Sequence, residues 1–326
     1  LMVKIVVAGA INWDINLFVK RFPEVGEEVA VERITRVPGG KAANVAVAIA
    51  RILGSGGVAL IGCLGRDSIA ENQIAILKGE GVDVSGVSFV EEAESGQAYI
   101  IIDGRGRNMI NTLFGANLRL LPEDLLAPER AHLIQESSIV TIIDPPLETI
   151  GSLASIAKKG GKTVVWDSGV RSTLGLRRLK DVLRNVDYLV INRVEIRNLT
   201  GEGDPFEARK RLEKVNPEIR LIAKLGEDGC SMMGPSGAME VPGINLEGLG
   251  MHVVNTVGCG DAFLGVFVAS KAEGLNDEEA LERANLAGAL KATRPETRGS
   301  PTRKELEKCL DAWKTKARLQ PIQDKI

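Results

Sequence analysis

The stretch NTVGCGDAFLG, residues 255–265, combines a glycine-spaced turn, one carboxylate and the beginning of an apolar run. The apolar run is typical of a buried helix, and the first amides of a helix have no hydrogen-bond partner within it. These amides carry partial positive charge and suit an anion, and glycines let the backbone approach that anion closely. The turn is therefore predicted to hold an anion.

Asp261 follows this turn directly, in the first turn of the expected helix. An aspartate there is also a common structural way to begin a helix. Together with an amide-lined hole, however, it supplies what phosphoryl transfer needs: donors for the moving charge and a base near the attacking hydroxyl. The helix dipole is expected to keep Asp261 ionised and hence a weak base, which suits a reaction that depends mostly on alignment and electrostatics.

A second glycine turn, PGGKAANVAVAIARILG at 38–54, also precedes a helical pattern. It is not a P-loop, because Thr35 stands where the first glycine belongs and Ala42 where Ser or Thr belongs. The opening segment KIVVAGA suggests a dinucleotide-binding enzyme, but it carries only Gly9 and no G-x-G-x-x-G. A nicotinamide enzyme is accordingly disfavoured.

Composition excludes several other classes. The 326 residues carry a formal net charge of −2 with scattered Lys and Arg, which argues against a nucleic-acid or membrane partner. No apolar run reaches the length of a membrane span, and the first residues lack a signal-peptide cleavage site, so a cytoplasmic protein is expected. The four cysteines lie far apart and the chain has only two histidines, which argues against a zinc site and against a disulfide framework.

Short β-rich runs alternate with helical patterns along the chain. The runs are 4–9, 58–65, 138–144, 163–167, 187–192 and 220–226, and the helical stretches include 41–53, 68–79, 148–159, 205–214, 278–292 and 302–316. This alternation predicts an α/β fold with a parallel-dominated sheet covered by helices on both faces. Ligands of such sheets bind beyond the carboxyl ends of the strands.

Two segments break this alternation. Residues 12–37 alternate apolar and polar side chains, and residues 97–114 have the pattern of a hairpin turned around Asp103-Gly104 and Gly106. Both suit a small inserted β-sheet, either a lid over a ligand or an edge extension. The predicted organisation is a core of 1–11, 38–96 and 115–326 with a lid of 12–37 and 97–114. Exposed strands often pair edge to edge, so a homodimer is expected.

Several motifs of the sequence resemble those of a known protein family. The pair GGK–AN (39–44) and T-x-G-x-G-D (256–261) is similar to that of the ribokinase-like carbohydrate kinases, the PfkB superfamily. Five further pieces resemble the family in its order: GAINWDIN (9–16), IIDPPLET (142–149), INRVEI (191–196), AKLGEDGC (223–230) and ANLAGALKAT (284–293). The resemblance implies the ribokinase-like fold and a kinase that moves the terminal phosphoryl group of a nucleotide to an alcohol of a sugar.

Position by position, the resemblance also implies roles. Asp261 is the expected base, with the anion hole at Gly258, Cys259 and Gly260. The acceptor sugar is expected at Asn12, Asp14, Gly39, Gly40, Lys41, Asn44 and Asp144. Magnesium and its waters are expected near Asn192 and Glu195, with Glu195 acting through water. The nucleotide is expected beside Lys224, Gly226, Gly229 and Asn285.

Three residues depart from the family pattern. Asn255 stands where many members have an aspartate tied to a monovalent cation, so potassium activation is left open. Cys259 fills a position usually held by Ala or Gly and is interpreted as a small filler rather than a redox-sensitive thiol. Lys224 replaces a small hydroxyl residue and is expected either to pair with a phosphate or to lie along the surface.

The acceptor is the open question. A ribosyl acceptor, free ribose or a nucleoside, is the first expectation, because GAINWDIN and PGGKAAN most resemble ribokinase and nucleoside kinases. The alternative is a phosphorylated sugar such as ribose 1-phosphate, or a sugar acid, whose anion Arg105, Arg107 and Arg171 would bind through paired donors. ATP is the expected donor, with ADP as the alternative. A non-catalytic sugar- or nucleotide-binding regulator is a remote alternative, because Asp261 is present.

Overall fold

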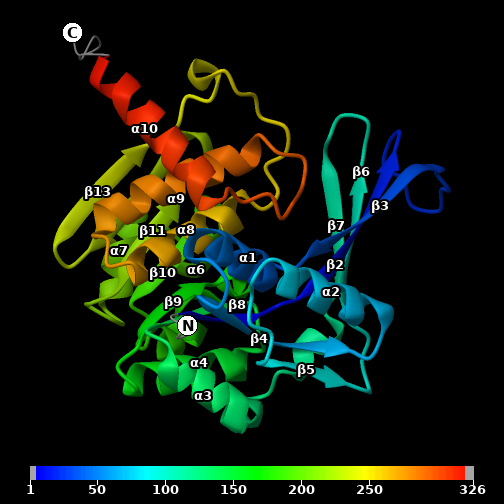
Figure 1. Cartoon of the computed structure of the whole chain (residues 1–326), viewed down its shortest axis with the longest axis horizontal. Coiled ribbons are helices and arrows are strands. Elements are labelled where there is room, and N and C mark those ends of the chain that lie inside the picture. Colours follow the sequence, from blue (N-terminus) through cyan, green and yellow to red (C-terminus); the bar gives the residue numbers. More distant parts are fainter. Residues whose placement is uncertain (1–4, 320–326) are drawn as a thin grey trace.

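The computed structural model describes residues 5–319, and side chains as far as residue 313. Two sheets organise the chain (Figure 1). The central sheet has nine strands in the order β13-β12-β11-β10-β9-β8-β1-β4-β5, and the smaller sheet has four in the order β3-β2-β6-β7. The expected fold class, a parallel-dominated α/β sheet with a separate small sheet, is confirmed.

The central sheet is parallel from β5 to β11 and ends in two antiparallel strands, β12 and β13. Its strands are β1 (Ile5–Gly9), β4 (Val58–Gly65), β5 (Val87–Val90), β8 (Ile139–Ile143), β9 (Thr163–Asp167), β10 (Tyr188–Asn192), β11 (Arg220–Lys224), β12 (Gly229–Gly234) and β13 (Gly237–Pro242).

Successive side chains of a strand point to opposite faces, and both faces of this sheet are buried. On β1, Ile5 and Val7 pack into one hydrophobic cluster while Val6 and Ala8 pack into the other. This explains why the strands read as continuous apolar runs.

Helices cover both faces (Figure 1). One face carries α1 (Lys41–Leu53), α2 (Ser68–Gly79), α8 (Cys259–Ala272), α9 (Asp277–Ala292) and α10 (Arg303–Leu319). The other carries α3 (Pro128–Glu136), α4 (Leu147–Lys159), α5 (Gly175–Leu183), α6 (Arg193–Thr200) and α7 (Pro205–Glu213). Among the described helices, none combines the length and apolar content that a membrane span requires.

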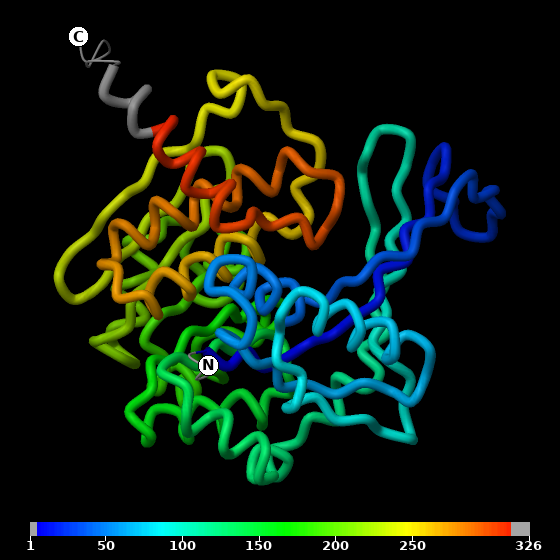
Figure 2. The backbone as a smooth tube through the Cα atoms, in the orientation of Figure 1, coloured from blue at the N-terminus to red at the C-terminus, as the bar shows by residue number. Residues whose placement is uncertain are grey.

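The smaller sheet consists of β2 (Asn12–Val19), β3 (Val31–Gly39), β6 (Gly96–Ile102) and β7 (Asn108–Leu113). The β2 and β6 strands are parallel, whereas β3 and β7 pair antiparallel to their neighbours. In Figure 2 the β6–β7 hairpin and the loop between β2 and β3 extend away from the core. The sheet ends at β3 and β7, whose outer edges pair with no other strand among residues 5–319.

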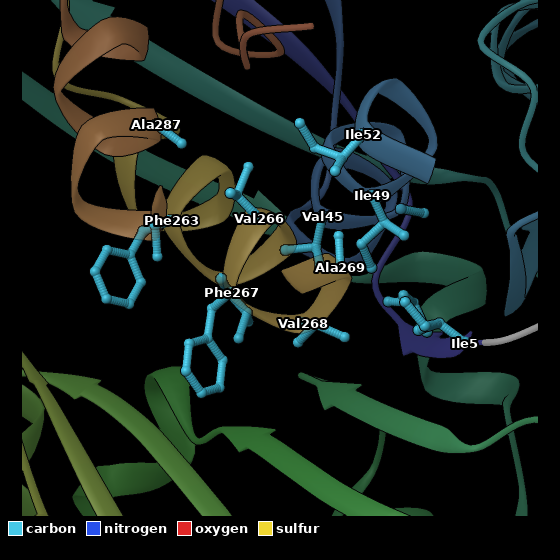
Figure 3. Close-up of a cluster of buried hydrophobic side chains, with 14 of the residues drawn as sticks. Ile5, Val45, Ile49, Ile52, Phe263, Val266, Phe267, Val268, Ala269 and Ala287 are labelled. Atoms are coloured by element: carbon cyan, nitrogen blue, oxygen red, sulfur yellow. The ribbon is translucent and has the colours of Figure 1, made fainter. Parts of the chain in front are cut away.

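Helix α8 lies between α1 and α9, with nine consecutive buried residues from Ala262 to Ser270 (Figure 3). Gly265 allows α8 to approach α1 closely, because a Cβ atom there would lie only 2.5 Å from the Cβ of Ala48. Residues four apart lie on one face of a helix. Asn44 and Asp261, one turn before Ala48 and Gly265 respectively, are consequently brought side by side.

Candidate active site

Polar residues stand at the carboxyl ends of neighbouring strands. Asn192 ends β10 and pairs in register with Lys224 at the end of β11. Asp167 ends β9 opposite Ile143 of β8, and Asp144 follows β8 directly. Because carboxyl ends of parallel strands share one edge of a sheet, the sequence places these groups together, beside the beginnings of α1 and α8.

Asp261 has a defined hydrogen-bond partner. Its Oδ2 accepts from the Asn44 Nδ2 at 2.8 Å, and the Asn44 Oδ1 in turn accepts from the Arg298 Nε at 3.0 Å. The buried Arg298 also donates from Nη2 to the Gly39 carbonyl oxygen at 2.8 Å. This chain of contacts orients the carboxylate and ties it to the glycine turn before α1.

The environment of Asp261 differs from the expectation. Desolvation raises the pKa of Asp261 above its ordinary value, and the hydrogen bond from Asn44 and the charge of Lys41 offset this only in part. This direction is opposite to the one expected from the helix dipole, because burial disfavours the charged form of the carboxyl group. A carboxylate with a raised pKa is a better general base than one held at a low pKa.

The acceptor side contains Asp14 and the two glycines before α1. Asp14 is buried, and desolvation raises its pKa to about 6. Gly39 makes room for it, since a Cβ on Gly39 would lie 2.2 Å from the Asp14 Oδ1. Gly40 has φ 89° and its own Cβ would lie 2.4 Å from the backbone nitrogen of Asn12. Only glycine fits at both positions.

Asn12 serves the local structure as well. Its Oδ1 accepts from the Asn117 Nδ2 at 2.8 Å, and its carbonyl oxygen accepts from the Gln73 amide. These contacts anchor the start of β2 to the core, and among the described residues no hydrogen-bond acceptor pairs with the Asn12 Nδ2.

The backbone of Asp144 has an uncommon conformation. It is the one residue other than glycine with positive φ, 56°, in the described part of the chain. Its Oδ1 is buried without a hydrogen-bond partner, and its Oδ2 lies 3.6 Å from the Lys41 Nζ. Desolvation raises the pKa of Asp144 to about 6. Strain of this kind clusters at ligand sites.

Asp167 was missed by the sequence analysis and joins two lysines. Its Oδ2 lies 2.9 Å from the Lys224 Nζ, and its Oδ1 lies 4.0 Å from the Lys41 Nζ. Desolvation acts to raise the pKa of Asp167, but the two ammonium groups outweigh it and hold the pKa below its ordinary value. The carboxyl end of the apolar run TVVWD was the available signal.

Lys224 does not lie along the surface. Its Nζ is 3.3 Å from where a Cβ on Gly260 would stand, so the ammonium group lies beside the first turn of α8. Its side chain is 15% exposed, and Asp167 helps to hold its pKa above the ordinary value. The expected surface placement is therefore wrong, and in this structure Lys224 pairs with Asp167.

The turn before α8 offers free amides. Gly258 has φ 87°, and the Cys259 amide donates to the Thr256 carbonyl oxygen at 3.2 Å. Within residues 5–319, no hydrogen bond satisfies the amides of Gly258, Gly260 or Asp261. The Cys259 amide is thus already engaged, and its neighbours remain available. Burial raises the pKa of the Cys259 thiol, which agrees with a filler role.

Asn192 and Glu195 form the beginning of α6. The Asn192 Oδ1 accepts from the amides of Val194 and Glu195, and the Glu195 Oε2 accepts from the Asn192 amide at 2.8 Å. This is a capping box, which accounts for the Asn-x-x-Glu spacing in purely structural terms. The charge of Glu195 nevertheless acts on Lys41, Lys224 and Asp144.

The residues present fit a magnesium ion that travels with a nucleotide. Across residues 5–319, no three His, Cys, Asp or Glu side chains form a cluster able to hold a metal. Magnesium in nucleotide sites keeps several waters and uses one or two carboxylates plus substrate phosphates. Glu195, with one carboxylate oxygen beyond its cap, suits such a water-mediated contact.

The remaining expected nucleotide residues lie at the end of β11 and on α9. A Cβ on Gly226 would meet nothing within 4 Å, whereas one on Gly229 would lie 2.1 Å from the Val241 carbonyl oxygen. Gly226 therefore borders open space, and Gly229 allows β13 to approach closely. Asn285 donates from its Nδ2 to the Pro242 carbonyl oxygen at 2.8 Å.

The three candidate arginines are separated. Arg105 and Arg107 are exposed at the tip of the β6–β7 hairpin, about 20 Å along β6 from its base, and Arg107 pairs with Asp103 at 2.6 Å. The structure does not bring them to the other site residues. Arg171 does lie there: its Nη2 donates to the Pro145 carbonyl oxygen at 3.3 Å, and its buried Nε has no partner.

A parallel sheet whose carboxyl edge meets a carboxylate and a helix start with unpaired amides has the arrangement expected of a ribokinase-like phosphotransferase. The family profile of the pfkB family carbohydrate kinases matches residues 2–304, and the chain belongs to this family. It is a carbohydrate kinase.

Individual relatives agree with this assignment. The chain is 33% identical over 301 residues to the ATP-dependent ribose-1-phosphate kinase of Halopiger xanaduensis, covering 92% of this chain and 96% of the relative. It is 29% identical to the ribokinase of Haemophilus influenzae, with 92% and 95% covered. The structure of Arabidopsis thaliana ribokinase complexed with ribose and ATP superposes with a TM-score of 0.85 at 27% identity, covering 95% and 99%.

Proposed function

We propose that this kinase transfers the terminal phosphoryl group of ATP to a hydroxyl of a ribosyl sugar, with Asp261 as the base. The single observation that carries the proposal is the Asp261 carboxylate at the start of α8, oriented by Asn44 at 2.8 Å and adjacent to the unpaired amides of Gly258 and Gly260.

Each residue of the site has a separate role in the proposed reaction. Asp261 takes the proton of the attacking hydroxyl, and its raised pKa favours that transfer. The unpaired amides and the Lys224 ammonium group receive the charge of the moving phosphoryl group, while Lys41 holds the acceptor against Asp144. Because these groups are fixed before substrate binds, they need little reorganisation during the reaction.

The acceptor is recognised by hydroxyl-binding carboxylates. Asp14 lies against Gly39 and Asp144 lies beside Lys41, at the start of α1, and both accept hydrogen bonds when ionised. A ribosyl acceptor is supported by the relatives named above, which are ribose-1-phosphate kinase and ribokinases. The unpaired Nε of Arg171 favours one second candidate, an acceptor that already carries a phosphate such as ribose 1-phosphate.

Magnesium bound to the nucleotide would neutralise charge on its phosphates, with Asn192 and Glu195 beside it. ATP is the proposed donor, in keeping with the ATP-dependent relative and the ribose and ATP complex of the Arabidopsis enzyme. ADP is the alternative donor. Four free cysteines, two of them buried, fit a reducing compartment, and we place the enzyme in the cytoplasm.

The small sheet is the proposed lid and dimer contact, and the remaining ranges 1–11, 38–96 and 115–326 are the kinase core. A lid would exclude water from the phosphoryl group and limit hydrolysis. Its strands expose large apolar side chains, namely Ile34 on β3, Tyr99 on β6, and Met109, Ile110 and Leu113 on β7. Exposed apolar strands with free edges are typical of contacts with a second copy. Replacing Ile110 by Lys should convert a dimer into a monomer in light scattering.

The test is a phosphorylation assay with Mg-ATP or Mg-ADP over ribose, nucleosides, ribose 1-phosphate, hexoses and sugar acids. One ribosyl acceptor should react at least tenfold faster than the hexoses, and Asp261→Asn should lower its kcat about a thousandfold or more. If Asp261→Asn keeps the parental rate with an acceptor that the parent uses, the proposed role of Asp261 as the base is refuted.

A further inference from the structure

Lys291, near the end of α9, is an unusual lysine because its side chain is fully buried at 0% exposure. Its Nζ donates to the carbonyl oxygens of Asn255 at 2.8 Å and Arg294 at 3.2 Å. Among the side chains that the structure describes, no carboxylate forms an ion pair with it. Burying an ammonium group without an ionic partner costs free energy relative to an apolar side chain. Packing alone therefore does not account for a lysine at this position.

The ammonium group lies directly behind the turn that precedes α8. A Cβ on Gly258 would stand 3.4 Å from the Lys291 Cε, and the Asn255 carbonyl oxygen that accepts from Lys291 begins this turn. The Asn255 side chain continues the connection, since its Oδ1 accepts from the Val257 amide at 3.0 Å and its Nδ2 donates to the Pro295 carbonyl oxygen at 2.8 Å. Lys291 thus joins the turn before α8 to the segment after α9.

The charge of Lys291 also reaches the site. Desolvation lowers the pKa of Lys291, while the neighbouring Cys259, Glu296 and Asp261 act to raise it. A positive charge behind the turn adds to the partial charge of the helix start, which is where the moving phosphoryl group would collect negative charge.

Main-chain carbonyl oxygens are also the ligands by which proteins replace the hydration shell of potassium. We propose that Lys291 is a built-in cation: its ammonium group fills a carbonyl-lined position behind residues 255–260, fixes that turn for phosphoryl transfer, and makes the rate independent of added monovalent cations. Lys291 is a positioning residue that acts through the turn. The inference rests on the proposed anion-binding role of Gly258 and Gly260.

The test compares three proteins in choline chloride and in potassium or ammonium chloride at equal ionic strength. The parent should show the same kcat in all three salts, within about twofold. Lys291→Ala vacates the carbonyl-lined position, so its kcat should fall about tenfold or more in choline and recover several-fold in potassium or ammonium. Lys291→Met fills most of the same volume without charge, so it should be slow in every salt. The KM for the sugar should change little, because Lys291 does not face the acceptor.

Lys271→Ala is the matched control. Lys271 also donates from Nζ to a backbone carbonyl, that of Leu275 at 2.8 Å, but it lies at the far end of α8. This variant should lose stability without any cation-specific change in kcat. The proposal is overturned if the parent needs potassium, if Lys291→Ala keeps the parental rate in choline, or if potassium fails to raise the rate of folded Lys291→Ala.

A second measurement needs no substrate. Potassium, compared with choline, should raise the melting temperature of Lys291→Ala and leave that of the parent unchanged, because only the variant has a position for the ion. If Lys291→Ala is insoluble in choline chloride, it should be purified in potassium chloride instead. A soluble variant in potassium chloride supports the proposal. If the variant is insoluble in both salts while Lys271→Ala is soluble, the result opposes the proposal. An inactive parent whose variant is still stabilised by potassium would contradict the proposed function and not the role of Lys291.

Discussion

The Asn44 Nδ2 donates to the Asp261 Oδ2 at 2.8 Å, and this contact joins the first turns of two helices that are 217 residues apart in the chain. It also lowers the pKa of Asp261 against the larger effect of desolvation. The position of the base and its readiness to accept a proton both depend on a side chain of the other glycine turn.

Replacing Asn44 by Leu should therefore change the pH dependence as well as the rate. Without the donor the pKa of Asp261 rises further, so the acid limb of the kcat profile should move to higher pH. A hydrogen bond to a charged group contributes about 1.5–3 kcal/mol, which corresponds to a fall in kcat of about tenfold to a hundredfold at neutral pH. Stopped-time assays between pH 5 and 9 would measure both effects.

Asn216→Ala is the control for this change. The Asn216 Nδ2 donates to the carbonyl oxygens of Leu183 and Val186, both at 2.9 Å, on the face of the sheet away from α1 and α8. It should lose stability and keep the parental pH profile. An unshifted acid limb in Asn44→Leu would contradict the assignment of Asp261 as the titrating base.

The sequence predicted the architecture because its patterns are local. The continuous apolar runs located six strands of the central sheet, and the helix 41–53 was predicted with the bounds it has. Short elements were not found: β5 has four residues, and α6 begins within the motif that was interpreted only as a metal and nucleotide site. A capping box and a ligand motif can share the same residues.

The site was predicted less completely, because part of it depends on tertiary contacts. Asp144 and Asn192 were expected from motifs of the family resemblance that lie at the ends of the runs 138–144 and 187–192. Asp167 also ends an apolar run, but none of those motifs covered it. Arg298 had no local signal, since it lies in an irregular segment and reaches Asn44 and Gly39 only through folding. The hairpin arginines Arg105 and Arg107 were expected at the ligand, but a turn pattern does not show which way a hairpin projects, and in this structure they lie at its tip.

Lys224 and Asp167 should separate stability from catalysis. Lys224→Met leaves the buried Asp167 carboxylate with the Gly169 amide at 3.0 Å and the more distant Lys41 ammonium group at 4.0 Å. This should cost roughly 3–5 kcal/mol of unfolding free energy and lower kcat. Adding Asp167→Asn removes the unpaired charge, so the double variant should regain most of the stability. It should not regain kcat if Lys224 acts on the phosphoryl group. Denaturant unfolding and kcat, measured on both variants, test this.

One result for the double variant would contradict a catalytic role of Lys224. Recovery of kcat together with stability in the double variant would mean that Lys224 only neutralises Asp167. Lys158→Met is a control, since Lys158 pairs with Asp187 at an exposed position and should change neither kcat nor stability strongly.

Ionised Asp14 is expected to favour acceptor binding and to lower the stability of the fold. Its pKa is 3.8 when unfolded and about 6 when folded, so ionisation is harder in the native state. The contribution of Asp14 to the free energy of unfolding is therefore highest below pH 4, decreases as the pH rises to about 6, and is lower by up to about 3 kcal/mol above that. Asp14→Asn should be more stable than the parent at pH 7–8, with a gain that shrinks below pH 5.

The same variant should bind the acceptor poorly, because a neutral amide replaces a carboxylate acceptor. Denaturant unfolding from pH 4 to 8, together with the KM for the acceptor, measures both effects. A gain in stability that does not depend on pH, or a loss at pH 7, would contradict the burial of an ionisable Asp14. Asp83→Asn, at a site whose carboxylate caps the exposed Ser85 amide, is a control without such a gain.

Arg171 should decide which acceptor the site takes. Its buried Nε has no hydrogen-bond partner and its charge acts on Asp144, so a phosphate there would gain paired donors that a neutral sugar does not need. Arg171→Ala should lower kcat/KM for ribose 1-phosphate about a hundredfold, and that for ribose or a nucleoside no more than about threefold. Arg178→Ala, on the exposed face of α5, should alter neither. Equal losses on neutral and phosphorylated acceptors would show that Arg171 supports Asp144 rather than a substrate phosphate, and the ribosyl hydroxyls would then carry all of the recognition.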